Sequence, residues 1–156
     1  MSIQHFRNAA LTVCILAVTA LAAENPFIGT WKINADKSKI SGADALQNVT
    51  VQYEMDGESM KASVQGTDAQ GQAVNFTYEA TLDGKPGTAT GSSTFDTIAL
   101  QKVGTHAIRA TAKKGAKVAY VDRRTVSKDG KTLTIARTGT DSKGKKYQST
   151  LVFDKQ

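Results

Sequence analysis

Cysteine is almost absent from this sequence. The one cysteine, Cys14, lies within an apolar run near the N-terminus, and none follows it. A domain that begins after this run therefore has no disulfide, no thiolate nucleophile and no cysteine ligand for a metal. The length of 156 residues is typical of one domain, whose stability must come from a packed core.

Charge is scarce at the N-terminus, where residues 1–22 have the features of a secretory signal peptide. Arg7 is the only Lys, Arg, Asp or Glu there, Ala9 to Leu21 is apolar, and Ala20-Leu21-Ala22 offers the small residues that a signal peptidase accepts. The apolar run is too short to span a bilayer well and no second run follows, so no integral membrane anchor is expected. The sequence predicts export of a secreted or periplasmic protein with one mature domain, 23–156.

Histidine is also rare. After the leader only His106 remains, on the inward phase of an expected strand with Ile108 and Ala110. It could ligate a haem iron, but a lone histidine near a strand start is more often a solvated rim residue. No nucleophile motif, carboxylate pair or metal-ligand spacing accompanies it. The sequence therefore predicts no enzyme, metal site or cofactor, and His106 is kept as a candidate ligand contact.

Acidic residues are outnumbered, with 14 Asp and Glu against 20 Lys and Arg and a formal net charge of +6. Most lysines fall in expected turns, where they favour solubility and protect strand edges; examples are Lys113, Lys114, Lys128, Lys131 and Lys143 to Lys146. Aromatic residues are few and are not interleaved with the basic ones, as binding to single-stranded nucleic acid would need. Nucleic acid is therefore not an expected partner.

Short stretches of alternating apolar and polar residues, separated by turns, run along the chain, and helical periodicity is nearly absent. The expected strands are Gly29–Ile33, Val49–Met55, Ser59–Gln65, Ala73–Ala80, Phe95–Gln101, His106–Ala112, Val118–Ser127, Thr132–Thr138 and Tyr147–Phe153. Asp-Gly pairs between strands, as at Asp129-Gly130, predict tight antiparallel hairpins. An open sheet would leave two vulnerable edges, so we expect an all-β, antiparallel up-and-down β-barrel of about 8–10 strands, present as a monomer.

An internal repeat has an offset of 73 residues. It aligns Asp56-Gly57 with Asp129-Gly130 and 66–68 with 139–141, so that the unit 49–80 recurs at 122–153. The alternative is that unrelated hairpins converge on Asp and Gly because turns need them. The alternation also puts Val49, Val51 and Tyr53 on one face of the first unit, which should be the interior.

Charged residues occupy interior positions in the second unit. A two-residue Asp129-Gly130 loop places Asp122 opposite Arg137, with Arg124 beside them, whereas the same counting places Val49 opposite Val64. Buried charges need pairing or water, so this cluster indicates a wet or ligand-holding lumen, where an arginine could bind a carboxylate or phosphate.

A bulge would reverse these faces. Asp122 and Arg137 would then form an ordinary surface pair, while Ala119, Val121 and Ala136 turn inward. The two alternatives differ in whether Asp122 and Arg137 point into the barrel.

The segment Phe27-Ile28-Gly29-Thr30-Trp31-Lys32-Ile33 resembles the first strand of the fatty-acid-binding proteins and of the wider lipocalin (calycin) group, which share a Gly-x-Trp near the N-terminus. The resemblance is architectural and is closest to short, exported bacterial proteins of lipocalin type. It implies structural roles for Gly29 and Trp31, with Trp31 closing the barrel floor against a basic residue from a late strand.

The resemblance also implies an interior site for fatty acids, retinoids, bilins or similar compounds, often held by arginine and tyrosine. Two features depart from the fatty-acid-binding proteins. The segment 34–48 is too short and polar for their helix pair, and the last expected strand lacks their late Arg-x-Tyr pattern.

Two functions follow. The first is a non-enzymatic binding protein for a small apolar or amphipathic, possibly acidic, molecule held in the lumen; its candidate ligand contacts are Arg124, Arg137, Asp122, Tyr120, Tyr147 and His106. The second is an envelope-associated structural or interaction protein with a filled barrel, whose basic loops contact an anionic surface or a protein partner.

Overall fold

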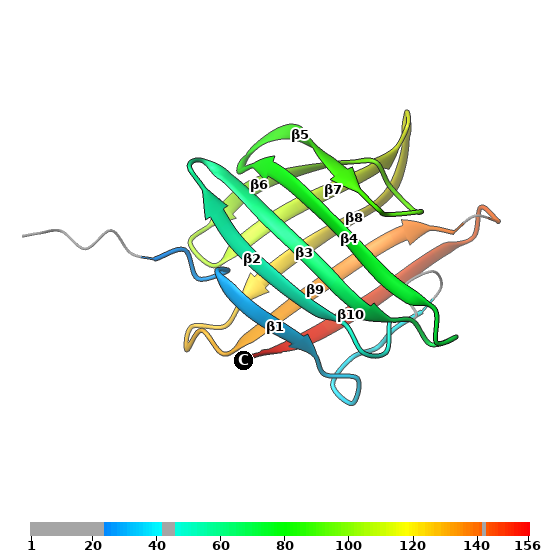
Figure 1. Ribbon diagram of the computed structural model, residues 1–156, viewed down its shortest axis with the longest axis horizontal. Helices are drawn as coiled ribbons and strands as arrows, with labels where there is room; N and C mark the ends of the chain where they lie inside the picture. Colours follow the sequence, from blue (N-terminus) through cyan, green and yellow to red (C-terminus); the bar gives the residue numbers. More distant parts are fainter. Residues whose placement is uncertain (1–23, 42–45, 142) are drawn as a thin grey trace, which may run out of the picture.

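The protein is a closed barrel of ten antiparallel strands (Figure 1). The computed structural model describes residues 24–41, 46–141 and 143–156, so the expected signal peptide, 1–22, lies outside the described residues. The strands are Gly29–Ile33 (β1), Thr50–Asp56 (β2), Ser59–Thr67 (β3), Ala73–Thr81 (β4), Asp83–Thr90 (β5), Thr97–Gly104 (β6), Ala107–Lys114 (β7), Lys117–Val126 (β8), Thr132–Thr140 (β9) and Lys146–Lys155 (β10).

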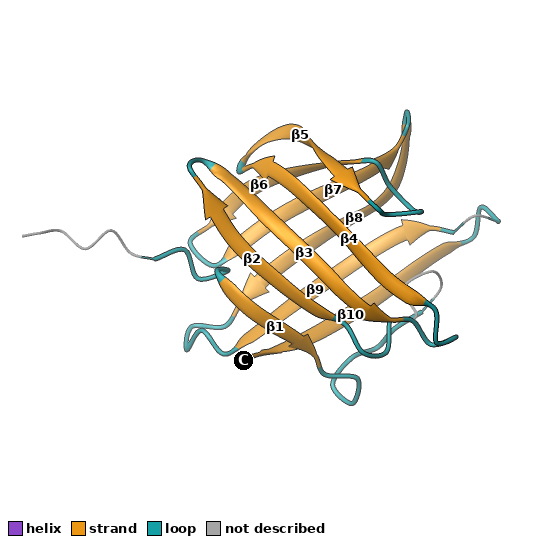
Figure 2. Cartoon of the chain, in the orientation of Figure 1, coloured by secondary structure: helices purple, strands orange, loops and turns teal. Residues whose placement is uncertain are grey.

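Each strand pairs with its neighbour in sequence, and β1 pairs with β10 to close the sheet. Strands and the loops that join them account for the described chain, apart from its two ends (Figure 2). The all-β, up-and-down barrel predicted from the sequence is therefore confirmed. Within the ranges that the structure describes, no helix is long and apolar enough to cross a membrane.

Alternation along the strands divides the interior from the surface. In β2, Val51 and Tyr53 are buried while Gln52 and Glu54 between them are exposed, as the two-residue period of a strand requires. Buried side chains from every strand except β5 meet in one core inside the barrel, and the partly buried Ala89 of β5 packs against it. The same period decides which polar residues are forced into that core.

The strand β5 was not among the predicted strands, which leave residues 81–94 without one. Its sequence, DGKPGTAT, contains two glycines and a proline and lacks large apolar residues. It forms only three residue pairs with β4, and its register with β6 shifts between Asp83 and Pro86. The barrel holds this segment as a strand although its local sequence favours a turn.

The repeat is visible in the turns. In the β3–β4 turn, the Asp68 carboxylate accepts hydrogen bonds from the backbone N–H groups two and four residues further on, at 2.9 and 2.8 Å. In the β9–β10 turn, Asp141 accepts the equivalent bonds at 2.9 and 2.8 Å. The register between β3 and β4 also equals that between β9 and β10 at the offset of 73 residues. The similarity therefore extends from the turn residues to the strand pairing.

The preceding hairpins do not match, and here the prediction was wrong. The β2–β3 turn lies between Asp56 and Ser59, one position later than expected, so Val64 faces Val51 rather than Val49. The β8–β9 turn follows the predicted register, with Asp122 opposite Arg137. The two hairpins thus differ by two residues in pairing, a shift that keeps the same side chains inside.

Trp31 lies fully buried at the start of the barrel. Its indole Nε1 donates a hydrogen bond to the backbone oxygen of Phe27 at 2.8 Å, and Lys155 Nζ of β10 lies 5.2 Å from the ring centroid. Gly29 has φ of 124°, and a Cβ there would meet the Lys155 side chain at 2.9 Å. A tryptophan packed against a basic residue of the last strand is the arrangement that the family resemblance implies.

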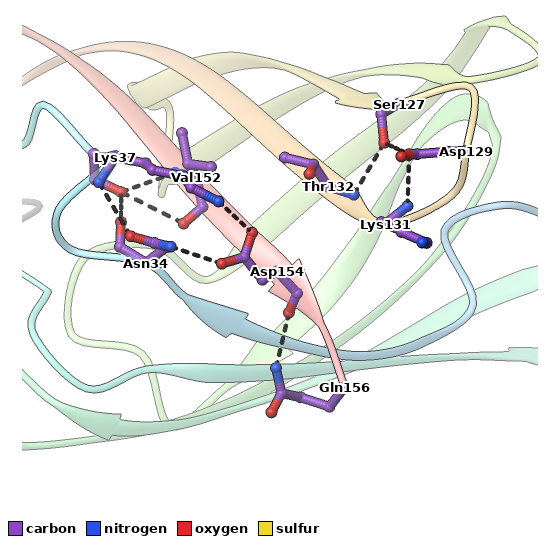
Figure 3. A network of polar contacts seen from close by, with 10 residues as sticks. Asn34, Lys37, Ser127, Asp129, Lys131, Thr132, Val152, Asp154 and Gln156 are labelled. Atoms are coloured by element: carbon purple, nitrogen blue, oxygen red, sulfur yellow. Dashed lines mark hydrogen bonds and ion pairs between the residues drawn. The ribbon is translucent and has the colours of Figure 1, made fainter.

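Side chains also tie β10 to the β1–β2 connection (Figure 3). Asp154 accepts hydrogen bonds from Asn34 Nδ2 at 2.7 Å and from Lys37 Nζ at 3.2 Å. The backbone N–H of Val152 donates to Ser38 Oγ at 2.9 Å. Residues 34–41 of the connection therefore lie along the last strand, next to the pairing of β1 with β10 that closes the barrel.

Gly66 should be intolerant of a side chain. A Cβ at this position would overlap the backbone carbonyl of Asn48, and its φ of 153° is unfavourable for other residues. We expect Gly66→Ala to destabilise the barrel by more than the roughly 1 kcal/mol typical of a strained turn position. Gly71→Ala is the control, because φ is also positive there but the surrounding space is open. Urea unfolding of both variants measures the difference, and equal stabilities would contradict the proposed overlap.

Candidate functional site

Asp122 and Arg124 point into the barrel. Only 2% of Asp122 and 3% of Arg124 is exposed, whereas Ala136 is exposed and Ala119 and Val121 are half-buried. The alternative in which a bulge turns the charged residues outward is therefore wrong. The interior holds the polar cluster that the strand alternation predicts.

Arg124 spans the interior from β8 to strands β2 and β4. Its Nε donates to Asp122 Oδ1 at 2.9 Å and its Nη2 to Asp122 Oδ2 at 3.4 Å. Its Nη1 donates to the hydroxyl oxygens of Tyr53, at 3.1 Å, and Tyr78. Four of the five guanidinium N–H groups are thus used by these three buried residues. Arg124 is held as part of the wall.

Arg137 lies on β9, nearer the end of the barrel that carries the β1–β2 connection. Its Nη2 donates to Asp122 Oδ2 at 2.9 Å, and its guanidinium carbon lies 3.7 Å from the centroid of the Tyr120 ring. Tyr120 in turn packs edge-to-face on Phe95 at 5.5 Å. The Arg137 side chain is 12% exposed, so it is the arginine of the cluster that reaches towards solvent.

The charges in the cluster stabilise one another. Burial alone would raise the pKa of Asp122, but the positive charges of Arg124 and Arg137 outweigh it and hold the pKa below the usual value of a carboxyl. Burial would lower the pKa of Arg124, but the Asp122 carboxylate keeps it well above its usual value. Burial raises the pKa of Tyr78 well above the usual value of a phenol. At neutral pH the cluster is an ion triad beside the neutral phenol of Tyr78.

A cavity of about 50 Å³ lies beside this cluster. Its wall combines the two arginines and three tyrosines with apolar side chains: Leu46, Val49, Val51, Tyr53, Val64, Phe76, Tyr78, Tyr120, Arg124, Ile135, Arg137, Leu151 and Phe153. An apolar wall with a few converging polar groups is typical of small-molecule sites. The volume is small, since a single water molecule already needs about 10–15 Å³.

The structure brings together four of the six predicted contacts: Asp122, Arg124, Arg137 and Tyr120. Tyr147 is half-buried, and its ring covers Gly139 of β9 without lining the cavity.

His106 lies in the turn before β7, half-buried and outside the cavity wall, so the strand does not extend to it as predicted. In the described parts of the chain, no three His, Cys, Asp or Glu side chains gather as a metal site would require.

Two members of the site were not predicted as ligand contacts, Tyr53 and Tyr78. Both lie on the inward phase of their strands, and a buried tyrosine hydroxyl needs a hydrogen-bond partner. The sequence could therefore have paired these two tyrosines with Arg124, the inward-facing donor that it predicts in the same barrel.

The comparisons with known proteins agree on the architecture. No family model and no curated protein matches the sequence. Among solved structures, a fatty acid binding protein from Schistosoma mansoni in complex with arachidonic acid has 16% sequence identity and a TM-score of 0.56, over 84% of this chain and 96% of that one. Zebrafish ileal bile acid-binding protein in complex with cholic acid has 12% identity and a TM-score of 0.52, over 84% and 99%. These similarities show a shared fold.

Removing the Asp122 carboxylate should destabilise the barrel strongly. In Asp122→Asn two guanidinium groups lose their buried counter-charge, a change that typically costs about 3–5 kcal/mol. The folded pKa of Asp122 lies below the unfolded value of about 3.9, so its contribution is present above about pH 4 and is lost as pH falls through the folded pKa. Denaturant unfolding at pH values from 7 down to 2.5 measures this loss. The free energy of unfolding should fall less towards acid pH in Asp122→Asn than in the unmodified protein.

Asp36→Asn is the matched control, because Asp36 is exposed in the β1–β2 connection, where solvent screens its charge. If Asp122→Asn does not fold, the double variant Asp122→Leu/Arg124→Met, which also removes the Arg124 charge, should recover folding. Equal stability of Asp122→Asn and the unmodified protein at pH 7 would show that the triad does not stabilise the barrel.

Proposed function

We propose that this barrel binds a small amphipathic molecule with an acidic head group in its interior and does no chemistry on it. The observation that carries the proposal is the buried Asp122, Arg124 and Arg137 triad beside a cavity with an otherwise largely apolar wall. Such a wall would contact the apolar part of the ligand, and a guanidinium would contact the acid.

The chain itself indicates that folding does not require these charges. At the repeat offset, Arg124 corresponds to Val51 and Arg137 to Val64, and both valines are buried in the opposite wall. Apolar side chains of suitable volume close a core at least as well as a buried ion triad. The presence of Asp122, Arg124 and Arg137 inside the second repeat unit is therefore more easily explained by recognition of a polar group than by a gain in stability.

The two arginines are assigned different roles. Arg124 uses four of its five N–H groups on Asp122, Tyr53 and Tyr78, and so supports the site. Arg137 reaches towards the end that carries the β1–β2 connection, and its stacking on Tyr120 fixes the plane of the guanidinium. We assign the contact with the acidic head group to Arg137.

The structures of similar fold lend support of a general kind. One holds cholic acid and the other arachidonic acid, both amphipathic carboxylic acids. At 12% and 16% identity they share the barrel with this chain but give no residue-level correspondence.

Arg137→Met should weaken binding while keeping the apolar stem of the side chain. Calorimetric titration with cholate, arachidonate and hexanoate should detect at least one acid that binds the unmodified protein. The affinity should fall about ten- to a hundredfold in the variant, since a charge-assisted hydrogen bond contributes about 1.5–3 kcal/mol. Arg123→Met, on the outward face of β8, is the control and should bind as the unmodified protein does.

Absence of binding by all three acids would refute the interior site. A similar loss of affinity in Arg123→Met would show that the contact is only a general charge effect.

We also propose that the protein acts outside the cytoplasm, on the strength of residues 1–22 of the sequence. Expression of the full chain in a secreting bacterial host should yield a product that begins at Ala23, as read by intact mass and N-terminal sequencing. Ala22→Lys should block cleavage at this site. A cytoplasmic product that keeps the whole leader would contradict export.

The second candidate is the filled barrel that docks through its basic loops. Six exposed lysines lie at the tips of two hairpins, Lys113, Lys114 and Lys117 in β7–β8 and Lys143, Lys145 and Lys146 in β9–β10. Both tips project from the same end of the barrel (Figure 1). The small cavity also fits this candidate, which replaces the first if no acid binds.

A further inference from the structure

The interior is divided across its width by a layer of hydrogen-bonded side chains, Asp122, Arg124, Tyr53 and Tyr78, which we call the Arg124 layer. Arg124 comes from β8, while the two tyrosines come from β2 and β4 on the far side of the ten-stranded ring. All four residues are at most 5% exposed. The layer therefore crosses the lumen from one wall to the other.

On the Trp31 side of this layer the interior is lined by side chains that are closed off from solvent. Trp31, Met60, Val126 and Leu133 lie there with at most 2% of each residue exposed. Val126 and Leu133 face each other between the Arg124 level and the β8–β9 turn. A ligand that enters from the opposite end therefore meets the Arg124 layer as a floor.

The cavity lies on the other side, between this floor and the end that carries the β1–β2 connection. Tyr120 precedes Arg124 by four positions on β8, and Arg137 follows Ile135 by two positions on β9, so both lie towards that end. Four residues of a tilted strand correspond to a depth of roughly 10 Å. The cavity volume of about 50 Å³ falls far below the roughly 300–1,000 Å³ of sites for drug-sized ligands.

We infer that the ligand is a short acid, of about six carbons, and not a long-chain lipid. This inference rests on the proposed function and specifies the ligand class of the same site. Arg137 would contact the acid group, Phe76 and Leu46 would contact the short apolar part, and the Arg124 layer would block a longer chain. Deeper entry would have to separate Arg124 from Tyr53 and Tyr78, the contacts that cross the lumen, and leave buried hydrogen-bonding groups without partners.

A chain-length series tests the inference. Hexanoate and palmitate, the latter below its micelle concentration, are titrated into the unmodified protein and into Arg137→Met, with backbone amide NMR shifts of β8 and β9 as the readout. Hexanoate should bind one-to-one with an affinity that falls at least tenfold in Arg137→Met, while palmitate should give no saturable shifts that depend on Arg137. Palmitate binding as tight as hexanoate and equally dependent on Arg137 would overturn the size limit and leave the interior site in place. If neither acid binds, the interior site itself is refuted.

A second variant tests whether the Arg124 layer sets the depth. Tyr78→Ala removes part of the floor but leaves Arg124 its bonds to Asp122 and Tyr53, so decanoate should gain at least tenfold in affinity over the unmodified protein. Tyr147→Ala is the matched control, because it removes a tyrosine that does not line the cavity. An equal gain in both variants, or no gain in Tyr78→Ala, would refute the role of the layer.

Discussion

The interior of this barrel depends on one carboxylate placed between two guanidinium groups. Asp122 lies within 2.9 Å of nitrogens of both Arg124 and Arg137 and has almost no contact with solvent. Without it, two like charges would share a region of low dielectric constant, where their repulsion is strong. With it, Arg124 can cross the lumen to two tyrosines, and Arg137 can lie flat on Tyr120. The position of the cavity, its floor and its polar wall all follow from this arrangement.

The barrel could be predicted from the sequence because its signals are local. Alternation with a period of two and Asp-Gly turns define most strands, and they also place Asp122 opposite Arg137. The strand β5 could not be found in this way, because its glycines and proline favour a turn and only its neighbours hold it extended. Likewise, Val64 pairs with Val51 and not with Val49 because of the exact placement of one turn. The Asp56-Gly57 pair alone does not determine that placement.

The candidate site was predictable in part. The inward charges follow from counting along a hairpin, whereas the contact of Arg124 with Tyr53 and Tyr78 joins strands far apart in the sequence and depends on how the barrel closes. Tyr147 and His106 were predicted to face inward from the alternation of apolar and polar residues alone. The structure shows that Tyr147 packs over Gly139 and that the strand begins just after His106. Volume is also inaccessible to pattern analysis, because it depends on how the aromatic side chains pack across the lumen.

The two-residue difference between the β2–β3 and β8–β9 hairpins has a wider consequence for barrels of this kind. An even-numbered slip moves a side chain along the barrel axis without exchanging inside for outside. A change in a surface turn can therefore give a buried residue a new cross-strand partner two residues further along the neighbouring strand, while the rest of the wall stays intact. The chemistry of the lumen can in this way be altered by insertions and deletions at the rim, where the chain tolerates them best.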